Sequence, residues 1–180
     1  VIVVNDGSDQ NCRQILQTLA QHYSQMVLVE HAENMGKGQA VLTGFAKAEQ
    51  LGLTHILQLD ADGQHDANDI SKLIEKIEQG YDLVVGARQK GSQASMGRGI
   101  ANKLYNNLAT YMSEHQVEDL TSGFRAVRAE KFKEFIYLLP NGFSYPTTST
   151  MAFFRAGYSV TYVPIHAAKR IGKSHIHPIK

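Results

Sequence analysis

The regular alternation of short apolar runs with amphipathic stretches constrains the fold of this chain more than any other feature. Residues 1–4 form a continuous run of β-branched side chains, and further strand-like segments with apolar residues follow at residues 26–29, 54–59 and 82–86. Continuous apolar runs of this length are typical of strands buried on both faces of a parallel sheet. Each run is therefore expected to be one strand.

Helical patterns fill the intervals between these runs. Ser8 or Asp9 can cap a first helix, and a second is expected over about residues 39–51. A third begins near residues 67–69 and ends at Gly80. Strand and helix thus alternate three times before residue 88, which predicts an α/β fold with a mostly parallel sheet flanked by helices on both faces.

Beyond residue 88 the pattern is less regular. A loop is expected at residues 89–97 and a helix at 98–112, and a short strand at 126–128 leads into a helix that ends at 138. A turn at 140–142, a helix at 147–156 and a last strand at 159–164 follow. The chain then ends in a basic tail over 169–177. No repeat or linker divides the chain, so residues 1–180 are expected to form a single domain.

Composition excludes several classes of protein. The formal net charge of +1 gives no electrostatic basis for binding nucleic acid. One cysteine, Cys12, excludes an intramolecular disulfide, and no apolar run approaches the ~18 residues needed to cross a bilayer. The chain starts inside an apolar run and stops directly after a basic segment, so it is expected to be a piece of a longer protein.

An acidic cluster marks the end of the strand expected at residues 54–59. Asp60, Asp62, Gln64, His65 and Asp66 follow this strand within seven residues. Ligands of open α/β sheets bind at the carboxyl ends of strands, and several oxygen donors there suit Mg²⁺ or Mn²⁺. An Asp-rich turn explains the same residues, because Asp-Gly is an ordinary turn signal. Taken alone, the cluster leaves these alternatives evenly balanced.

Other charged residues follow strands or lie in loops. Asp6 ends the first strand and is expected beside the acidic cluster, on a neighbouring parallel strand, although a turn explains it equally well alone. Lys37 lies between glycines in a loop that could approach a phosphate. Asp119 is a candidate general base, with a capping or salt-bridge role as the alternative. Positively charged side chains recur at Arg88, Arg98, Arg125, Arg170 and Lys173. They could bind a second, phosphate-bearing substrate, and five unrelated surface charges are the alternative.

Six of these segments together resemble a known family. They are Val3-Val-Asn-Asp-Gly-Ser-Asp9, Asn34-Met-Gly-Lys-Gly38, Leu59-Asp-Ala-Asp-Gly-Gln-His65, Val85-Gly-Ala-Arg88, Asp119-Leu-Thr-Ser-Gly-Phe-Arg125 and Arg170-Ile-Gly-Lys-Ser174. In this order and spacing the set resembles the family 2 inverting glycosyltransferases of the GT-A fold. Within that family it is most similar to the dolichyl-phosphate mannose synthase-like and bacterial polyprenyl-phosphate sugar transferases.

The resemblance implies a role for each matching position. Asp6 would contact the base or ribose of the donor. Lys37 and Arg88 would act on its diphosphate. Asp119 would occupy the position of the catalytic base in the family. Arg125, the last residue of the same motif, would be a second catalytic candidate. The remaining roles are a metal and diphosphate site at Asp60, Asp62 and Gln64, and an acceptor-phosphate site at Arg98, Arg170, Lys173 and Ser174.

The implied activity is metal-dependent transfer of a sugar, with inversion, from a UDP- or GDP-linked donor to a polyprenyl phosphate. The full-length protein would then work in the cytoplasm at the inner face of the membrane, with peripheral membrane contact. Two alternatives stay open: a cytosolic transferase acting on a saccharide, and a nucleotide-binding fragment without catalysis. The chain departs from the family at Asn5, where an Asp is usual, and the family's first strand would lie before Val1, so the fold is expected to be truncated there.

Overall fold

The computed structural model describes residues 1–89, 96–142 and 144–168, with the side chains of 96–102 left out. The chain divides into two compact units, each built from two segments. The first unit comprises Val1–Ile56 and Ala129–Ser149, and the second comprises Leu57–Arg128 and the residues from Thr150 onward.

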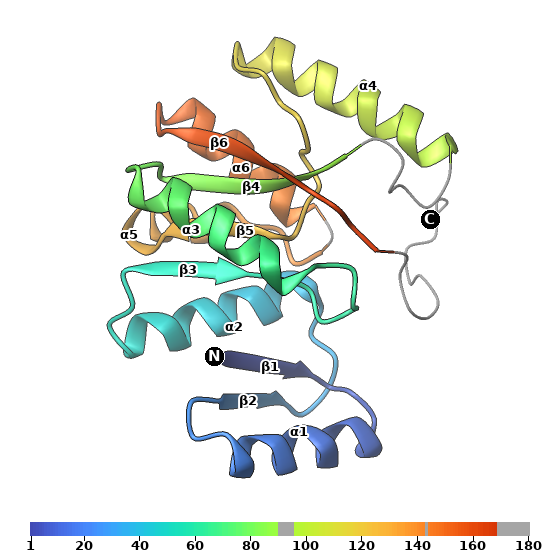
Figure 1. Ribbon diagram of the computed structural model, residues 1–180, viewed down its shortest axis with the longest axis vertical. Coiled ribbons are helices and arrows are strands. Elements are labelled where there is room, and N and C mark those ends of the chain that lie inside the picture. Colours follow the sequence, from blue (N-terminus) through green and yellow to red (C-terminus); the bar gives the residue numbers. More distant parts are fainter. Residues whose placement is uncertain (90–95, 143, 169–180) are drawn as a thin grey trace. The chain divides into compact units, whose positions relative to one another are not determined.

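The first unit contains a parallel pair of strands, β1 (Ile2–Asp6) and β2 (Val27–His31). Their register pairs each residue of β1 with one of β2, so both strands end level with each other. Helix α1 (Gln10–His22) follows β1, and α2 (Lys37–Gln50) follows β2 and lies beside β1 (Figure 1). The carboxylate of Asp9 caps α1, as the sequence predicts.

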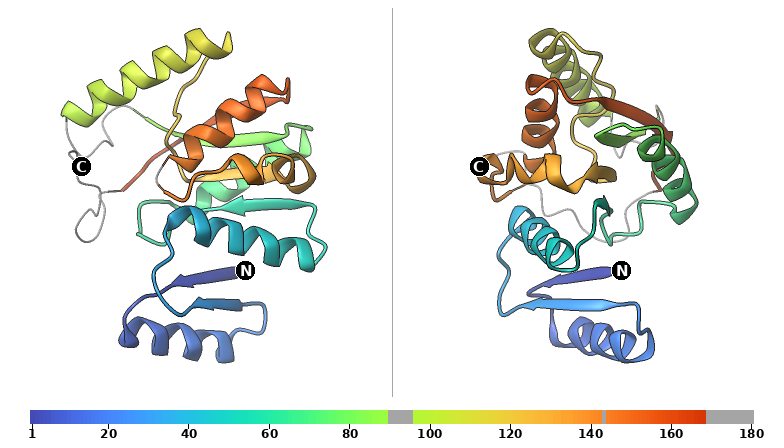
Figure 2. Two further views of the ribbon diagram at one scale, coloured as in Figure 1. Left: turned by 180° about the vertical axis from the view of Figure 1, so that it is seen from behind. Right: turned by 90° about the vertical axis from the view of Figure 1, so that its left-hand side faces the viewer.

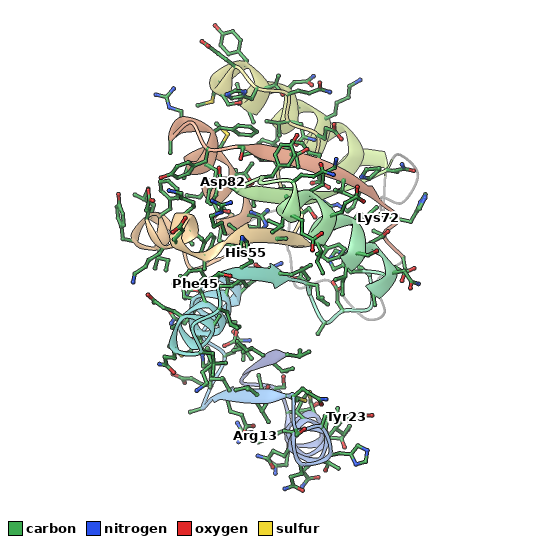
Figure 3. The ribbon with its side chains drawn as sticks, turned by 60° about the vertical axis from the view of Figure 1, so that its left-hand side comes forward. Arg13, Tyr23, Phe45, His55, Lys72 and Asp82 are labelled. Carbon is green, nitrogen blue, oxygen red and sulfur yellow. The ribbon has the colours of Figure 1, made fainter. Side chains whose placement is uncertain are left out.

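The second segment of the first unit packs against α2. It contains α5 (Ala129–Lys133) and the short helix η2 (Ile136–Leu138). The ring of Phe45, labelled in Figure 3, lies 4.9 Å from the ring of Phe132, centroid to centroid. Residues more than 80 positions apart in the sequence thereby form the apolar centre of this unit.

The second unit contains a four-stranded mixed sheet. Its strand order is β3 (His55–Gln58), β5 (Arg125–Arg128), β4 (Leu83–Arg88) and β6 (Val160–Ile165). β6 runs parallel to β4 and β5 runs antiparallel to it. At the start of β4 the carboxylate of Asp82, labelled in Figure 3, accepts hydrogen bonds from the backbone N–H and the hydroxyl of Ser159 at 3.0 and 2.8 Å.

Helices cover both faces of β6 (Figure 2). One face packs on α3 (Ile70–Glu78), which follows the short helix η1 (Ala67–Asp69). The other packs on α4 (Met96–Ser113) and on α6 (Tyr145–Arg155). Alternate residues of β6 enter the two cores, which gives the strand the period of two expected of a pleated strand. Val163 and Ile165 join the α3 core, whereas Val160 and Tyr162 join the other.

The element types follow the sequence prediction closely, but the pairing of strands does not. The prediction that Asp6 and Asp60 end neighbouring parallel strands is wrong. β1 pairs with β2 in one sheet, and β3 belongs to the other sheet beside the antiparallel β5. Among the helices that the structure describes, none combines the length and the apolar character that a membrane crossing requires.

Candidate active site

The acidic cluster forms a turn that leads from β3 to η1. The carboxylate of Asp62 accepts a hydrogen bond from the N–H of Gln64 at 3.2 Å, and that of Asp66 accepts one from the N–H of Asn68 at 2.9 Å. Such bonds from Asp side chains to nearby backbone are the usual chemistry of Asp-rich turns. The two alternatives for this cluster are thus compatible, because a turn at a strand end can also present carboxylates.

Gln64 ties this turn to the end of β6. Its backbone oxygen accepts a hydrogen bond from the N–H of Ala168 at 3.0 Å, and its side-chain Nε2 donates to the Ala168 oxygen at 3.2 Å. The side-chain amide is therefore oriented with Nε2 towards Ala168, and only its Oε1 has the chemistry of a metal ligand. The assignment of Gln64 to a metal stays a prediction.

His65, which the sequence places in the acidic cluster, packs against an aromatic ring in the structure. Its ring lies against the ring of Phe124, with 4.9 Å between centroids and 37° between the planes. This contact fixes the turn against the residue that precedes β5. A small cavity of about 50 Å³ opens beside it, and its lining residues are Asp60, Gln64, His65, Arg88, Thr121, Ser122, Gly123 and Ala167.

Arg88 and Asp119 form a bidentate ion pair at one wall of this cavity. Nε of Arg88 lies 2.7 Å from Oδ2 of Asp119, and Nη2 lies 2.9 Å from Oδ1. The backbone N–H of Arg88 also donates to Oδ2, and Thr121 donates to Oδ1 through its N–H and its hydroxyl. The Asp119 side chain is 8% exposed and that of Arg88 26%. Both oxygens of this carboxylate therefore accept hydrogen bonds from protein donors.

This environment lowers the pKa of Asp119. Burial alone would raise it, but the hydrogen bonds and charge of Arg88 and the backbone N–H groups outweigh burial and bring the pKa below its ordinary value. The same pairing raises the pKa of Arg88, with a smaller contribution from the charge of Asp60. A carboxylate with a lowered pKa and five protein donors is a weak proton acceptor. The role of Asp119 as a base stays a prediction, and its contacts favour the salt-bridge alternative.

Arg125 lies inside the second unit. Its side chain is 1% exposed, and its guanidinium donates through Nε to the backbone oxygen of Ser122 at 3.2 Å and through Nη1 to the hydroxyl of Thr150 at 3.4 Å. This buried guanidinium holds the backbone at Ser122 through its hydrogen bonds. The catalytic role of Arg125 stays a prediction. Its buried hydrogen bonds also give it a role in stabilising the second unit.

Asp6, in the first unit, is surrounded by donors of a different kind. Its Oδ1 lies 2.7 Å from Nδ1 of His31 and 2.8 Å from the N–H of Met35, and its Oδ2 lies 3.0 Å from the N–H of Gly36. Burial would raise the pKa of Asp6, but these hydrogen bonds lower it overall. The carboxylate is 18% exposed, so a ligand donor could still reach it.

The loop around Lys37 is held by residues from the far end of the unit. Asn141 accepts a hydrogen bond from the N–H of Gln39 at 3.0 Å and donates one to the oxygen of Met35 at 2.6 Å. A Cβ added to Gly38 would lie 2.5 Å from the oxygen of Pro140. Residues 140–142 approach these glycines closely in the structure, and the approach of a ligand to the same segment stays a prediction. The contact of Lys37 with a diphosphate stays a prediction.

The predicted acceptor-phosphate residues cannot be placed together. Arg170, Lys173 and Ser174 lie outside the described residues, and Arg98 lies in α4 where the side chains are not described. The described residues that the structure does bring together are those of the cavity, which come from the ends of β3, β4 and β6 and from the segment before β5.

The donor set of the turn fits one class of metal site. Among the described side chains, no group of three or more His, Cys, Asp or Glu residues could enclose a metal ion. Mg²⁺ and Mn²⁺ do not need such a cage, because these ions are commonly held by one or two carboxylates together with substrate phosphates and water. Asp60 and Asp62, two residues apart after β3, fit this requirement.

The comparison with protein families gives a direct result. The model of glycosyl transferase family 2 matches residues 1–136, which make up more than half of the chain and extend over both units. The chain therefore belongs to glycosyl transferase family 2, and the predicted resemblance is confirmed.

Curated relatives narrow the comparison. The chain is 29% identical over 168 residues to the glycosyltransferase AglJ of Haloferax volcanii, covering 91% of this chain and 52% of AglJ. It is 27% identical to the polyprenol monophosphomannose synthase of Mycolicibacterium smegmatis, covering 94% and 67%. It is 31% identical to the UDP-N-acetylglucosamine–dolichyl-phosphate N-acetylglucosaminyltransferase of Methanococcus voltae, covering 74% and 60%. The chain thus spans between about half and two thirds of the length of these relatives.

Solved structures support the fold. The glucosyl-3-phosphoglycerate synthase of Mycobacterium tuberculosis, in complex with Mn²⁺, uridine diphosphate and phosphoglyceric acid, superimposes with a TM-score of 0.71 at 17% identity. The match covers 96% of this chain and 60% of that one. The expected α/β fold of the GT-A type is confirmed by this likeness.

Proposed function

We propose that the full-length protein transfers a sugar from a nucleotide donor to a polyprenyl phosphate, with inversion and with Mg²⁺ or Mn²⁺ as cofactor. The observation that carries this proposal is the cavity where Asp60 meets Arg88 and residues 121–123, in a chain of glycosyl transferase family 2. The names of the M. smegmatis and M. voltae relatives support a polyprenyl or dolichyl phosphate as acceptor. The reaction would take place at the cytoplasmic face of the membrane, where peripheral contact brings the protein to its acceptor.

In this proposal Asp60 and Asp62 would hold the cation, which would supply positive charge beside the donor diphosphate. Arg88, which also lines the cavity, contributes a second positive charge. Its described contacts with Asp119 and Thr121 use Nε and Nη2, which leaves Nη1 as the edge of the guanidinium for a phosphate oxygen. Asp119 then acts on Arg88, by holding its fork in one orientation, and has no proton to remove.

The transfer itself is a single displacement. An oxygen of the acceptor phosphate forms a bond to the anomeric carbon, while the bond from that carbon to the donor phosphate oxygen breaks. The bonding electrons leave with the nucleoside diphosphate. A phosphate monoester is already ionised near neutral pH, so no side chain has to act as a base. Positioning and stabilisation of the leaving group are then the contributions of the protein.

The test is sugar transfer by the full-length protein from labelled UDP- and GDP-sugars to undecaprenyl or dolichyl phosphate in detergent, with Mn²⁺ or with EDTA. Asp62→Asn is expected to reduce the rate by about a hundredfold or more, because one of two carboxylate ligands is lost. Asp66→Asn is the matched control. It removes the same charge from the same turn but keeps a good capping side chain, and should stay within about twofold of the wild type.

Three results would contradict the proposal. Equal rates in EDTA and Mn²⁺ would remove the metal. Transfer to a saccharide but to neither lipid phosphate would replace the acceptor by that of a cytosolic transferase. Tight binding of UDP or GDP without transfer to any acceptor would leave only nucleotide binding.

A further inference from the structure

A chain of hydrogen bonds in the first unit joins three side chains from three elements. His31, the last residue of β2, pairs through Nδ1 with Asp6 at 2.7 Å and through Nε2 with the hydroxyl of Thr43 at 2.9 Å. Asp6 ends β1 directly opposite His31 in the strand register, and Thr43 lies in α2. The His31 side chain is 9% exposed, so this network lies largely away from solvent.

The chemistry of the partners fixes the direction of these bonds. The carboxylate of Asp6, whose pKa is lowered, only accepts hydrogen bonds, so Nδ1 of His31 must carry a proton. When Nε2 carries no proton, the hydroxyl of Thr43 donates to it. Both ring nitrogens are satisfied in this tautomer, and the imidazole is held at both ends.

The far side of Asp6 holds the loop that leads into α2. The carboxylate accepts hydrogen bonds from the N–H groups of Met35 and Gly36, the two residues that directly precede α2. His31 therefore holds Asp6, Asp6 holds two backbone amides, and these amides set the path of the chain just before Lys37. Gly36 has a φ of +94°, a conformation that glycine adopts far more readily than residues with a side chain.

The order acid, imidazole, hydroxyl is also that of a hydrolytic triad. The proposed single displacement has no covalent enzyme intermediate. Thr43 lies on the second turn of α2, whereas the acid at the other end of the chain bonds the loop amides. The network therefore positions the loop, and its hydroxyl serves as an anchor.

We propose that His31 is a positioning residue that, with Thr43 as its anchor, orders Met35 and Gly36 at the start of α2 for a nucleoside diphosphate. This inference rests on the proposed function for the identity of the ligand. The ordering itself is a property of the protein without ligand, and the two parts can be measured separately.

The experiment measures two quantities on the same proteins. The first is hydrogen exchange at the amides of Met35 and Gly36 by NMR without ligand, and the second is the Kd for UDP and for GDP with Mn²⁺ by calorimetry. His31→Leu is expected to accelerate exchange at both amides by about tenfold or more and to raise the Kd by a similar factor, because a hydrogen bond to a charged group is lost. Nitrogen chemical shifts of the wild-type ring should show the tautomer with its proton on Nδ1.

A milder pair of variants guards against a loss of folding. Thr43→Val keeps the shape of the side chain and removes the hydroxyl, so it should change both quantities in the same direction as His31→Leu, by a smaller factor. Thr43→Ser keeps the hydroxyl and should restore wild-type values. His22→Gln changes an exposed histidine of the same unit and is the matched control, expected to leave both quantities unchanged.

The inference is wrong if folded His31→Leu exchanges these amides at the wild-type rate, if the proton is on Nε2, or if Thr43→Ser behaves like Thr43→Val. If the wild type binds neither UDP nor GDP while the exchange results hold, the proposed function fails and the positioning role stands.

Discussion

Asp6 and Asp119 are two predicted site carboxylates that the protein holds in contrasting ways. Asp119 is 8% exposed and is paired with a guanidinium, so its negative charge is balanced by a positive one. Asp6 is 18% exposed and receives hydrogen bonds from an imidazole and two backbone amides. The first arrangement fixes a cation, and the second organises a loop. Removing a partner should therefore have different costs in the two units.

The largest effect is expected from breaking the ion pair of the second unit. Arg88→Leu leaves the buried carboxylate of Asp119 without its cation, and the free energy of unfolding should fall by about 3–5 kcal/mol. Urea denaturation measures this change. Lys133→Met is the control, since it breaks the exposed pair with Glu49 and should cost less than about 1 kcal/mol. Equal costs for the two variants would show that the Arg88–Asp119 pair is not desolvated.

Acid should weaken the same pair without any substitution. The folded-state pKa of Asp119 is lowered, so its contribution to stability is complete above the unfolded-state value of about 3.9 and is lost as the pH falls through the folded-state pKa. Denaturation midpoints between pH 6 and pH 2 should therefore decline below about pH 4. Asp119→Asn should show a shallower decline over this window. A decline of equal slope in both proteins would assign the acid sensitivity to other groups.

The close contact between Gly38 and the backbone of residues 140–142 should matter nearly as much for stability as the ion pair. Gly38→Ala places a Cβ 2.5 Å from the Pro140 oxygen and 2.8 Å from the Asn141 Cα, both of them backbone atoms that cannot rotate away. The free energy of unfolding should fall by about 1–3 kcal/mol. Gly142→Ala in the facing turn is the matched control, because among the described residues other than its chain neighbours no atom lies within 4 Å of its added Cβ. A neutral Gly38→Ala would mean that the turn at residues 140–142 is easily displaced.

The smallest effect is expected at Asn141. Asn141→Ala removes the acceptor for the Gln39 N–H near the start of α2, where Gly36 as N-cap has no side chain to offer. Loss of a cap should lower the free energy of unfolding by about 1 kcal/mol. Asn141→Asp keeps the acceptor and should recover part of that loss, although its carboxylate cannot donate to the Met35 oxygen. Full recovery would show that only the cap matters.

Local features of the fold could be predicted from the sequence because they depend on neighbouring residues. The β-branched run at residues 1–4 and the helical stripe after Ala67 led to β1 and α3, and Asp9 was recognised as a helix cap. The antiparallel placement of β5 between β3 and β4 could not be predicted, because the periodicity of a strand carries no information about its partner.

The candidate site was predictable to the same extent. The sequence identified Arg88 and Asp119 as functional candidates but gave them separate roles, since nothing local shows that residues 31 positions apart are paired. His31 was missed because a single histidine has no motif. Its position at the end of the strand after Asp6 was the available signal, since adjacent parallel strands that end level bring their last residues together.

The link between Asn141 and the start of α2 also has a consequence for synthesis of the protein. The Gln39 amide and its acceptor are separated by 102 positions, and the whole second segment of the first unit follows most of the second unit in the sequence. At about 5–20 residues per second, a ribosome needs roughly 5–20 s to deliver Asn141 after Gln39. During that interval the second unit can begin to fold, whereas the first unit cannot be completed before residues 129–149 have been synthesised.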